Sequence, residues 1–327
     1  MKPVLQVEHL SIAFRTYAGV VEAVDDVSFS AYAGETLGIV GESGCGKSVT
    51  AQAITQLLPR QSVAYIKGEV YLEDDNLLAY TEREMHEVRG AQIGMIFQDP
   101  MTTLNPVLTV GSQIGESLIV HEGLSRQEAL ESVLELLQLV NISSPETRLQ
   151  QYPHELSGGM RQRCVIAMAL ACSPRVLIAD EPTTALDVTT EAEVLGLFQS
   201  LEQRCHMATI LISHNLGIVA QLCRRVIVMY AGQVVEEGLV ASIFDRPSHP
   251  YTKGLLGSLP DPDVPDKVLV GIGGHAPDLF AMPTGCRFHH RCGQAMQVCK
   301  AEKPPRLALD KEHWVRCWLY SPERTMK

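Results

Sequence analysis

Residues 41–48 of the chain read GESGCGKS, and this stretch decides the fold. It follows the short apolar run Thr36–Val40 (TLGIV) and precedes a segment with helical periodicity. The spacing G-x-x-x-x-G-K-[ST] between a strand and a helix is that of a loop whose backbone N–H groups surround phosphates. In such a loop Lys47 reaches the outer phosphates and the Ser48 hydroxyl binds Mg²⁺. The predicted phosphate-binding residues are Gly41, Ser43, Gly44, Cys45, Gly46, Lys47, Ser48 and Val49.

A second motif supplies carboxylates for the same chemistry. The apolar run Val176–Ala179 (VLIA) ends in Asp180 and Glu181. A strand that ends in Asp-Glu is by itself common at a solvated turn. Beside a phosphate-binding loop, however, the first carboxylate is expected to support the Mg²⁺ shell and the second to polarise a water for attack on the γ-phosphate.

The remaining apolar runs predict an α/β fold. Runs at 93–97, 209–212 and 226–229 lack strict alternation, which is typical of parallel strands covered on both faces. Longer amphipathic segments separate them, and the segment 125–140 begins with a capping box formed by Ser125 and Glu128. We therefore predict a three-layer core with a parallel sheet. Extra antiparallel strands are expected at one edge, carried by Val4, Leu5, Val7, Val24, Val27 and Phe29.

Composition limits the class of protein. The chain has 327 residues, of which 46% are hydrophobic and 20% charged, so it is expected to be globular. Its net charge of −11 argues against a general nucleic-acid binder. No apolar run approaches the ~20 residues of a membrane-spanning helix, and the N-terminus has no signal-peptide pattern. We expect a cytosolic chain whose nine cysteines are reduced or bind metal.

A third motif indicates the family. Residues 156–163 read LSGGMRQR and lie shortly before Asp180. This segment resembles the LSGGQ signature of ABC transporter ATPases. The carboxylates after residue 179 resemble that family's Walker B motif, residues 185–187 its D-loop, residues 96–99 its Q-loop and residues 213–215 its H-loop. The resemblance implies an ABC-type nucleotide-binding domain of the P-loop NTPase fold over residues 1–250, with a helical signature subdomain at about 99–172.

The resemblance also implies roles for single residues. Gln98 would contact Mg²⁺ and water together with Ser48 and Asp180, and His214 would hold the γ-phosphate. A lone histidine after a strand is more often structural, so only the motif context favours a catalytic role for His214. The signature would cap the γ-phosphate of ATP held by a partner subunit, through Ser157, Gly158, Gly159 and Met160, with Asp187 in the D-loop. Tyr17 is the predicted adenine-stacking residue, and Phe14 is the alternative.

Two positions depart from the family pattern. Met160 stands where Gln is most frequent in the signature, and Asn215 stands where Asp is frequent after the H-loop histidine. Neither change removes a charge or hydroxyl from the predicted chemistry. The chain's own Walker site is therefore expected to hydrolyse ATP, with Glu181, His214, Gln98 and Lys47 as its catalytic residues.

The C-terminal part narrows the resemblance. Residues 246–256 (RPSHPYTKGLL), residues 285–292 (GCRFHHRC) and the Q-loop region 97–106 resemble the ATPases of oligopeptide, dipeptide and nickel importers. This implies ATP-driven import of di- or oligopeptides. It also implies a second ABC ATPase subunit that forms a heterodimer, two transmembrane permease subunits and, indirectly, an extracytoplasmic substrate-binding protein. The chain would lie on the cytoplasmic face of the membrane.

Four cysteines are gathered in the predicted small irregular extension at 251–327. Cys286, Cys292, Cys299 and Cys317 follow the spacing C-x5-C-x6-C-x17-C. Four thiolates suit either tetrahedral Zn²⁺ or a [4Fe–4S] cluster, and free or disulfide-bonded cysteines are a further alternative. The subfamily resemblance points to [4Fe–4S] in a structural or docking role. His289 or His290 is an alternative ligand, although surface histidines are the simpler interpretation.

Other functions stay open at this stage. An importer of nickel or another small solute would use the same ATPase motifs, because specificity lies in other subunits. A soluble ABC ATPase of DNA repair or the ribosome usually has two nucleotide domains or a long coiled-coil insertion, and neither is seen here. An Fe–S regulatory protein would not need the full set of hydrolytic motifs.

Overall fold

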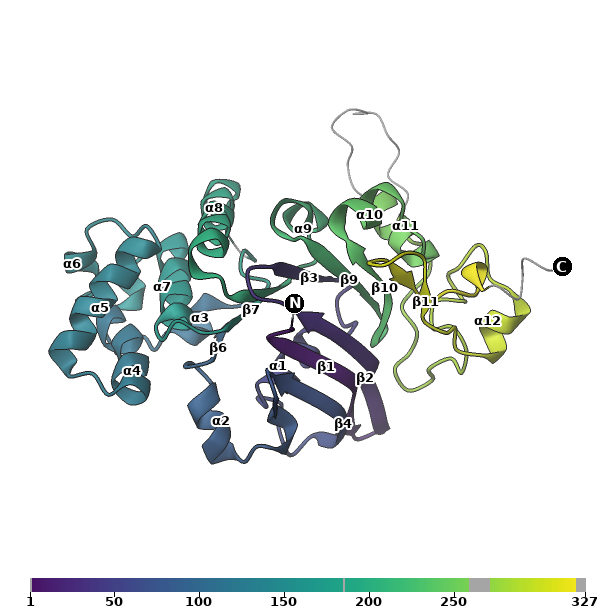
Figure 1. The fold of residues 1–327 in the computed structure, drawn as a ribbon, viewed down its shortest axis with the longest axis horizontal. Coiled ribbons are helices and arrows are strands. Elements are labelled where there is room, and N and C mark those ends of the chain that lie inside the picture. The colour runs from purple at the N-terminus through teal and green to yellow at the C-terminus, as the bar shows by residue number, and fades with distance from the viewer. Residues whose placement is uncertain (1, 185, 259–270, 322–327) are drawn as a thin grey trace. The chain divides into compact units, whose positions relative to one another are not determined.

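The structure is a computed structural model that describes residues 2–184, 186–258 and 271–321 (Figure 1). Two compact units divide the chain. The first comprises residues 1–5, 30–36 and 71–212, and the second comprises residues 6–29, 37–70 and 213–327. The predicted division near residue 250 stays a prediction. Ala185 of the predicted D-loop and residues 259–270 and 322–327 of the predicted extension lie outside the described residues.

Parallel strands form the centre of the first unit. β6 (Ile93–Ile96) pairs with β7 (Val176–Asp180), which pairs with β8 (Ala208–Ile212), both in parallel. Every residue of β7 and β8 is buried. This confirms the prediction that the runs without alternation are strands covered on both faces. The short strand β5 (Asp75–Asn76) pairs with the end of β4 (Val63–Leu72).

Helices make up most of the rest of the first unit. α4 (Val110–Glu122), α5 (Arg126–Leu139) and α7 (Gly158–Leu170) pack on one another, and α7 also contacts β6 (Figure 1). The predicted capping box of Ser125 and Glu128 is present at the start of α5. The other long helix of this unit is α8 (Val188–Cys205). The shorter elements are α2 (Glu82–Val88), α3 (Pro100–Thr103), α6 (Pro145–Arg148), η1 (Leu77–Ala79) and η2 (Pro153–Glu155).

The second unit contains two sheets. β1 (Leu5–Thr16) and β2 (Gly19–Ala31) are neighbouring strands joined by a two-residue turn, and β4 lies on the other side of β1. The predicted edge strands are therefore present, but the prediction of their place was wrong, because they form a sheet of their own with β4 and not an edge of the parallel sheet. In the other sheet β3 (Thr36–Val40) pairs in parallel with β9 (Arg225–Tyr230), and β10 (Gln233–Leu239) returns antiparallel to β9.

The C-terminal residues extend the second of these sheets. β12 (Trp314–Val315) pairs antiparallel with β10, and β11 (Leu307–Ala308) pairs with β12. These two strands were not predicted, because a strand of only two residues has no recognisable pattern. The helices of the unit are α1 (Lys47–Ile54), α9 (Leu216–Leu222), α10 (Val240–Asp245), α11 (Pro250–Gly257), α12 (Gln297–Ala301) and η3 (Trp318–Tyr320).

Among the described residues, no helix is both long enough and apolar enough to cross a membrane. One of the longest apolar runs of the sequence, residues 164–172, falls mainly in α7, where Cys164, Val165 and Ile166 are fully buried. It is therefore a core segment of the first unit.

The contact between β6 and α7 predicts a specific destabilisation. A Cβ atom at Gly94 would lie 2.2 Å from the carbonyl oxygen of Ala169, which belongs to the backbone and cannot swing aside. We expect Gly94→Ala to lower the free energy of unfolding by about 2 kcal/mol, as overpacked cores do. The control is Gly196→Ala, at an exposed helical position with nothing within 4 Å, which should stabilise by about 0.5–1 kcal/mol. Urea unfolding followed by circular dichroism measures both, and equal unfolding midpoints for the two variants would contradict the prediction.

Candidate nucleotide-binding site

The phosphate-binding loop predicted at 41–48 connects β3 to α1 in the second unit. Gly41, Gly44 and Gly46 have φ values of 154°, 77° and 103°, a region that favours glycine. Two of them also lie directly against other backbone. A Cβ atom on Gly41 would lie 2.2 Å from the Met229 carbonyl oxygen, and one on Gly46 would lie 2.7 Å from the Ala23 carbonyl oxygen. Gly41 and Gly46 are therefore required by both conformation and space, and Gly44 by conformation alone.

Lys47 is folded into this loop. Its ammonium group donates hydrogen bonds to the carbonyl oxygens of Gly41 and Glu42 at 2.8 and 3.1 Å, and only 5% of the residue is exposed. A buried ammonium group needs such partners, because an unpaired buried charge is costly. The lysine is thus held beside the loop it is predicted to serve. Ser48 and Val49 follow it in the first turn of α1, both half-buried.

The loop is also fastened by its neighbours in the second unit. The N–H of Gly232 donates to the Cys45 carbonyl oxygen at 2.9 Å, and the N–H of Asp25 donates to the Gly232 carbonyl oxygen at 2.8 Å. Cys45 is buried, and this burial raises the pKa of its thiol. It packs as a small apolar residue in a position where many other side chains would not fit.

His214 follows β8 and is exposed. The next residue, Asn215, begins α9 as its N-cap, and its side-chain oxygen accepts a hydrogen bond from the N–H of Gly217 at 2.9 Å. Aspartate and asparagine are equally good at this position. The departure from the family pattern at residue 215 therefore preserves the start of the helix that follows the histidine.

Tyr17 lies in the turn between β1 and β2 and is fully exposed. Phe14, the alternative, lies within β1 and is half-buried. Neither position tests adenine stacking, which stays a prediction.

In the first unit, the structure brings together Gln98 and Glu181. The side-chain amide of Gln98 donates to Glu181 Oε2 at 3.1 Å, and the Thr184 hydroxyl donates to the same oxygen at 2.9 Å. Asp180 stands beside them as the buried last residue of β7. Thr184 was not predicted as a site residue, although a threonine three residues after Glu181 in a turn can reach its carboxylate.

Glu181 has an unusual backbone. Its φ is 50°, in the left-handed region that costs a residue with a side chain about 1–2 kcal/mol. Its N–H donates to the Ile212 carbonyl oxygen at 2.9 Å, and its carbonyl oxygen accepts from the Thr184 N–H at 3.1 Å. Such strain is frequent at functional sites, because surrounding bonds hold the side chain in a fixed direction.

The signature segment begins α7. The Ser157 side chain is the N-cap and accepts a hydrogen bond from the Met160 N–H at 3.3 Å. Gly158 and Gly159 form the first turn, and a Cβ atom on Gly159 would lie 2.4 Å from Thr190 Cγ2. Thr190 is in turn bound by the Asp187 carboxylate at 3.0 and 2.8 Å, and these hydrogen bonds lower the pKa of Asp187. The signature and the D-loop aspartate are thus adjacent.

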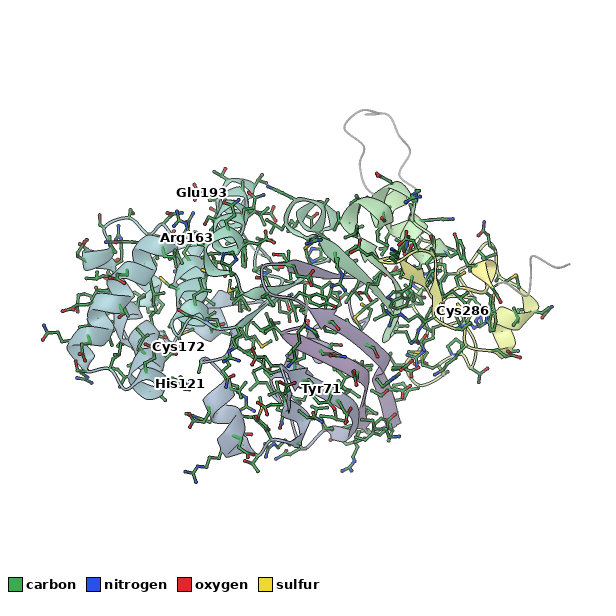
Figure 2. The ribbon with its side chains drawn as sticks, in the orientation of Figure 1. Tyr71, His121, Arg163, Cys172, Glu193 and Cys286 are labelled. Carbon is green, nitrogen blue, oxygen red and sulfur yellow. The ribbon has the colours of Figure 1, made fainter. Side chains whose placement is uncertain are left out.

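Arg163 fixes the direction of the signature helix. Its guanidinium donates to the Val140 carbonyl oxygen at 2.7 Å, at the end of α5, and to Glu193 of α8 at 2.9 Å (Figure 2). The side chain of Arg163 is only 10% exposed. This arginine belongs to the signature segment 156–163, but its role in joining three helices was not predicted from the sequence.

Cys286, Cys292, Cys299 and Cys317 line one pocket in the second unit, together with His249, Phe288 and Trp318. Its cavity volume is about 10 Å³, the space of about one water molecule. The Cys286 N–H donates to the Cys299 carbonyl oxygen at 2.8 Å, which fixes two of the cysteine segments to each other. All four cysteines are free of disulfide bonds. Across the described residues, no group of three or more His, Cys, Asp and Glu side chains is arranged to hold a metal ion.

Burial makes this pocket uncharged. It raises the pKa of Cys286 to about 12 and that of Cys317 to about 11, and it lowers the pKa of His249 to about 4. The thiols of Cys286 and Cys317 are therefore protonated at neutral pH. Any metal that binds them has to displace these protons.

Comparisons with known proteins agree with this geometry. The family model described as ABC transporter matches residues 24–184, and the one described as oligopeptide/dipeptide transporter, C-terminal region, matches residues 235–299. A solved dimer of the ATP-binding cassette MJ0796 bound to ADP and Pi is similar, with a TM-score of 0.65 and 26% identity over 72% of this chain and 98% of that one. The chain therefore has the ABC ATPase fold and is an ATPase of this class, for which ATP and Mg²⁺ are the expected ligands.

Relatives extend the similarity over nearly the whole chain. The dipeptide transport ATP-binding protein DppD of Bacillus subtilis is 52% identical over 98% of this chain and 95% of its own length. The oligopeptide transport ATP-binding protein OppD of the same organism is 50% identical over 98% of this chain and 89% of its own length. The chain belongs to the ATP-binding subunits of oligopeptide/dipeptide ABC transporters, which confirms the predicted resemblance.

The packing of the phosphate-binding loop gives a prediction for nucleotide binding. Gly41→Ala adds a methyl group that meets the Met229 carbonyl oxygen, so the loop has to move and its N–H groups lose their common direction. We expect the affinity for MgATP to fall about 100-fold or more, because several charge-assisted hydrogen bonds are disturbed together. Titration with a fluorescent ATP analogue measures this. The control is Gly123→Ala, which has a similarly unfavourable φ of 69° but open space around it and should bind as the wild type does. Unchanged affinity in Gly41→Ala would contradict the prediction.

Proposed function

We propose that this chain hydrolyses ATP to drive the import of di- and oligopeptides through a membrane transporter. The observation that carries the proposal is the extent of the similarity. Relatives named as dipeptide and oligopeptide transport proteins match 98% of the chain, including the C-terminal region beyond the ATPase motifs. The proposed organisation is a nucleotide-binding domain at 1–250 and a cysteine-rich extension at 251–327.

The residues of the site have distinct proposed roles. Lys47 and the N–H groups of the loop 41–48 bind the phosphates, while Ser48, Asp180 and Gln98 serve Mg²⁺ and its water. Glu181 polarises the attacking water and His214 holds the γ-phosphate. The bonds from Gln98 and Thr184 to Glu181 support this role, because they hold the carboxylate in one direction. Catalysis then rests on positioning and on charge stabilisation.

The signature segment is proposed to act on a second ATP. Ser157, Gly158, Gly159 and Met160 would contact the γ-phosphate bound by a partner ATPase subunit, which we propose to be a different chain. The N-terminus of the 13-residue helix α7 supports this role, since helix N-termini favour anions. Asp187 binds Thr190 of α8, and Thr190 lies directly against Gly159.

The permease subunits are proposed to dock on the helical part of the first unit. A groove with a volume of about 500 Å³ runs between α4 and α5, and Leu108, Ile119 and Leu130 are among the residues that line it. Val120, which also lines the groove, is 53% exposed. Exposed apolar residues around a groove are typical of an interaction site. This position, a few residues after Gln98, would connect the permease to the catalytic water and place the chain at the cytoplasmic face of the membrane.

The four cysteines of the extension are proposed to bind a [4Fe–4S] cluster. Each cysteine of such a cluster binds a different iron atom, so the four sulfur atoms have to surround a volume. Cys286, Cys292, Cys299 and Cys317 border one pocket, which supports this arrangement. The cluster would supply a cross-link between segments far apart in the sequence, and the chain's own residues do not suggest a redox substrate. A substrate-binding protein outside the membrane completes the proposed importer, and no nucleic acid takes part.

The catalytic role of Glu181 is tested by Glu181→Gln. The amide cannot accept the proton of the attacking water, so kcat should fall about 10²–10⁴-fold while MgATP still binds. Glu202→Gln, in the last turns of α8, is the control and should keep wild-type turnover. Phosphate release by the transporter complex and binding of a fluorescent ATP analogue measure the two properties. Wild-type turnover in Glu181→Gln would refute the role.

The cluster is tested by anaerobic purification with iron and sulfide analysis. We expect about four iron and four sulfide per chain, with visible absorption, for a [4Fe–4S] group. Cys299→Ser, at a buried cysteine of the pocket, should lose both, whereas Cys205→Ser, at an exposed cysteine of α8, should retain both. One zinc per chain without iron would overturn the cluster.

A further inference from the structure

Arg291 of the C-terminal extension forms a bidentate ion pair with Glu42, the second residue of the phosphate-binding loop. Its two terminal nitrogens donate to the two carboxylate oxygens of Glu42 at 2.8 and 3.0 Å. The arginine side chain is 7% exposed and that of Glu42 is 29% exposed. A two-pronged, charge-assisted contact of this kind fixes direction as well as distance. The pair joins residues 249 positions apart in the sequence.

Arg291 is itself rigidly held. Its Nε donates to the Gly273 carbonyl oxygen at 2.9 Å and its Nη2 to the Ile272 carbonyl oxygen at 3.1 Å. The guanidinium also lies 5.8 Å from the ring centre of Tyr230 and 5.9 Å from that of Phe288. Because the guanidinium is anchored on several sides, it can hold the Glu42 carboxylate in place.

A second contact secures the backbone of Glu42. Its N–H donates to the Tyr251 hydroxyl at 2.8 Å. Tyr251 is fully buried and packs against the rings of Tyr230 and Phe288, and its burial raises the pKa of the phenol. The neutral Tyr251 hydroxyl, fixed by its packing, thus accepts the hydrogen bond of the Glu42 N–H at the start of the loop. Glu42 is held by both its side chain and its backbone.

Glu42 transmits these contacts to the catalytic lysine. Its carbonyl oxygen accepts hydrogen bonds from Lys47 Nζ at 3.1 Å and from the Cys45 N–H at 3.2 Å. The loop and its lysine therefore rest on a residue that Arg291 and Tyr251 hold. The arginine also balances a carboxylate that would otherwise lie, uncompensated, in a loop for anionic phosphates.

We propose that Arg291 is a positioning residue for ATP, which acts through Glu42 to keep the phosphate-binding loop in its binding conformation. The inference rests on the ATP-binding role proposed for residues 41–48. Without the clamp the loop samples other conformations, and ATP has to restore the competent one as it binds. The apparent affinity then falls by the fraction of competent molecules, while the bound complex reacts normally. The signature of the role is a raised KM for MgATP with little change in kcat.

The test compares Arg291→Gln, Glu42→Gln and the double variant in the full chain assembled with its transporter subunits. Arg291→Gln should raise the KM for MgATP about tenfold, the size expected when one charge-assisted pair is lost, with kcat within about twofold of wild type. In the Glu42→Gln background the same substitution should have no further effect, because its target is gone. The matched control is Arg306→Gln, an extension arginine that contacts Trp314 and Glu237 instead of the loop, and it should keep the wild-type KM.

Three results would overturn the inference. The first is an unchanged KM in folded Arg291→Gln. The second is that adding Arg291→Gln to Glu42→Gln raises KM as much as it does in the wild type. The third is that Arg306→Gln raises KM as much as Arg291→Gln does. If Arg291→Gln does not fold, Tyr251→Phe removes the second contact and should raise KM about threefold, as expected for one neutral hydrogen bond. An unchanged KM there would then overturn the inference. Absence of MgATP hydrolysis by the wild-type complex would instead refute the proposed function.

Discussion

The nucleotide loop depends on close contact between backbones without a side chain between them. Gly41 lies against the Met229 carbonyl oxygen of β9, and Gly46 lies against the Ala23 carbonyl oxygen of β2. The Gly232 N–H bonds the Cys45 carbonyl oxygen across the same region. A loop built mainly of flexible residues would lose much conformational entropy on ordering. Here the cost is met by contacts that already exist in the folded unit, so the N–H groups need little rearrangement when phosphate arrives.

A different solution operates at the carboxylate that is proposed to activate water. Glu181 holds a left-handed backbone conformation with a φ of 50°, which its side chain disfavours. The hydrogen bonds to Ile212, Thr184 and Gln98 outweigh that strain. Gln98 and Thr184 supply the two side-chain bonds that fix the carboxylate, so its direction depends on both of these neighbours.

The sequence predicted those features that local physics determines. Buried parallel strands have to be apolar on both faces, so the runs at 36–40, 93–97 and 209–212 were recognisable as β3, β6 and β8. The capping box at Ser125 was equally local. Contacts between residues far apart in the sequence have no local sequence pattern that predicts them. Nothing near Glu42 signals Arg291 or Tyr251, and β12 is too short to show a strand pattern. The positions of the motifs were therefore predictable, while their supporting residues were not.

The segment between Cys286 and Cys292 connects the cysteine pocket with the phosphate-binding loop, two parts of the second unit that belong to different sequence motifs. Beside Arg291 it carries Arg287, which is buried and bonds the Ala231 carbonyl oxygen and the Asp25 carboxylate. Ala231 precedes Gly232, whose N–H holds Cys45 in the loop. Arg291 thus contacts the loop directly and Arg287 contacts a residue next to one that supports the loop, and both belong to a segment whose ends border the cysteine pocket. Binding equilibria that share a structural element are linked, and the linkage is reciprocal. A group bound by the cysteines that tightened this segment would favour ATP, and ATP would in turn favour retention of that group.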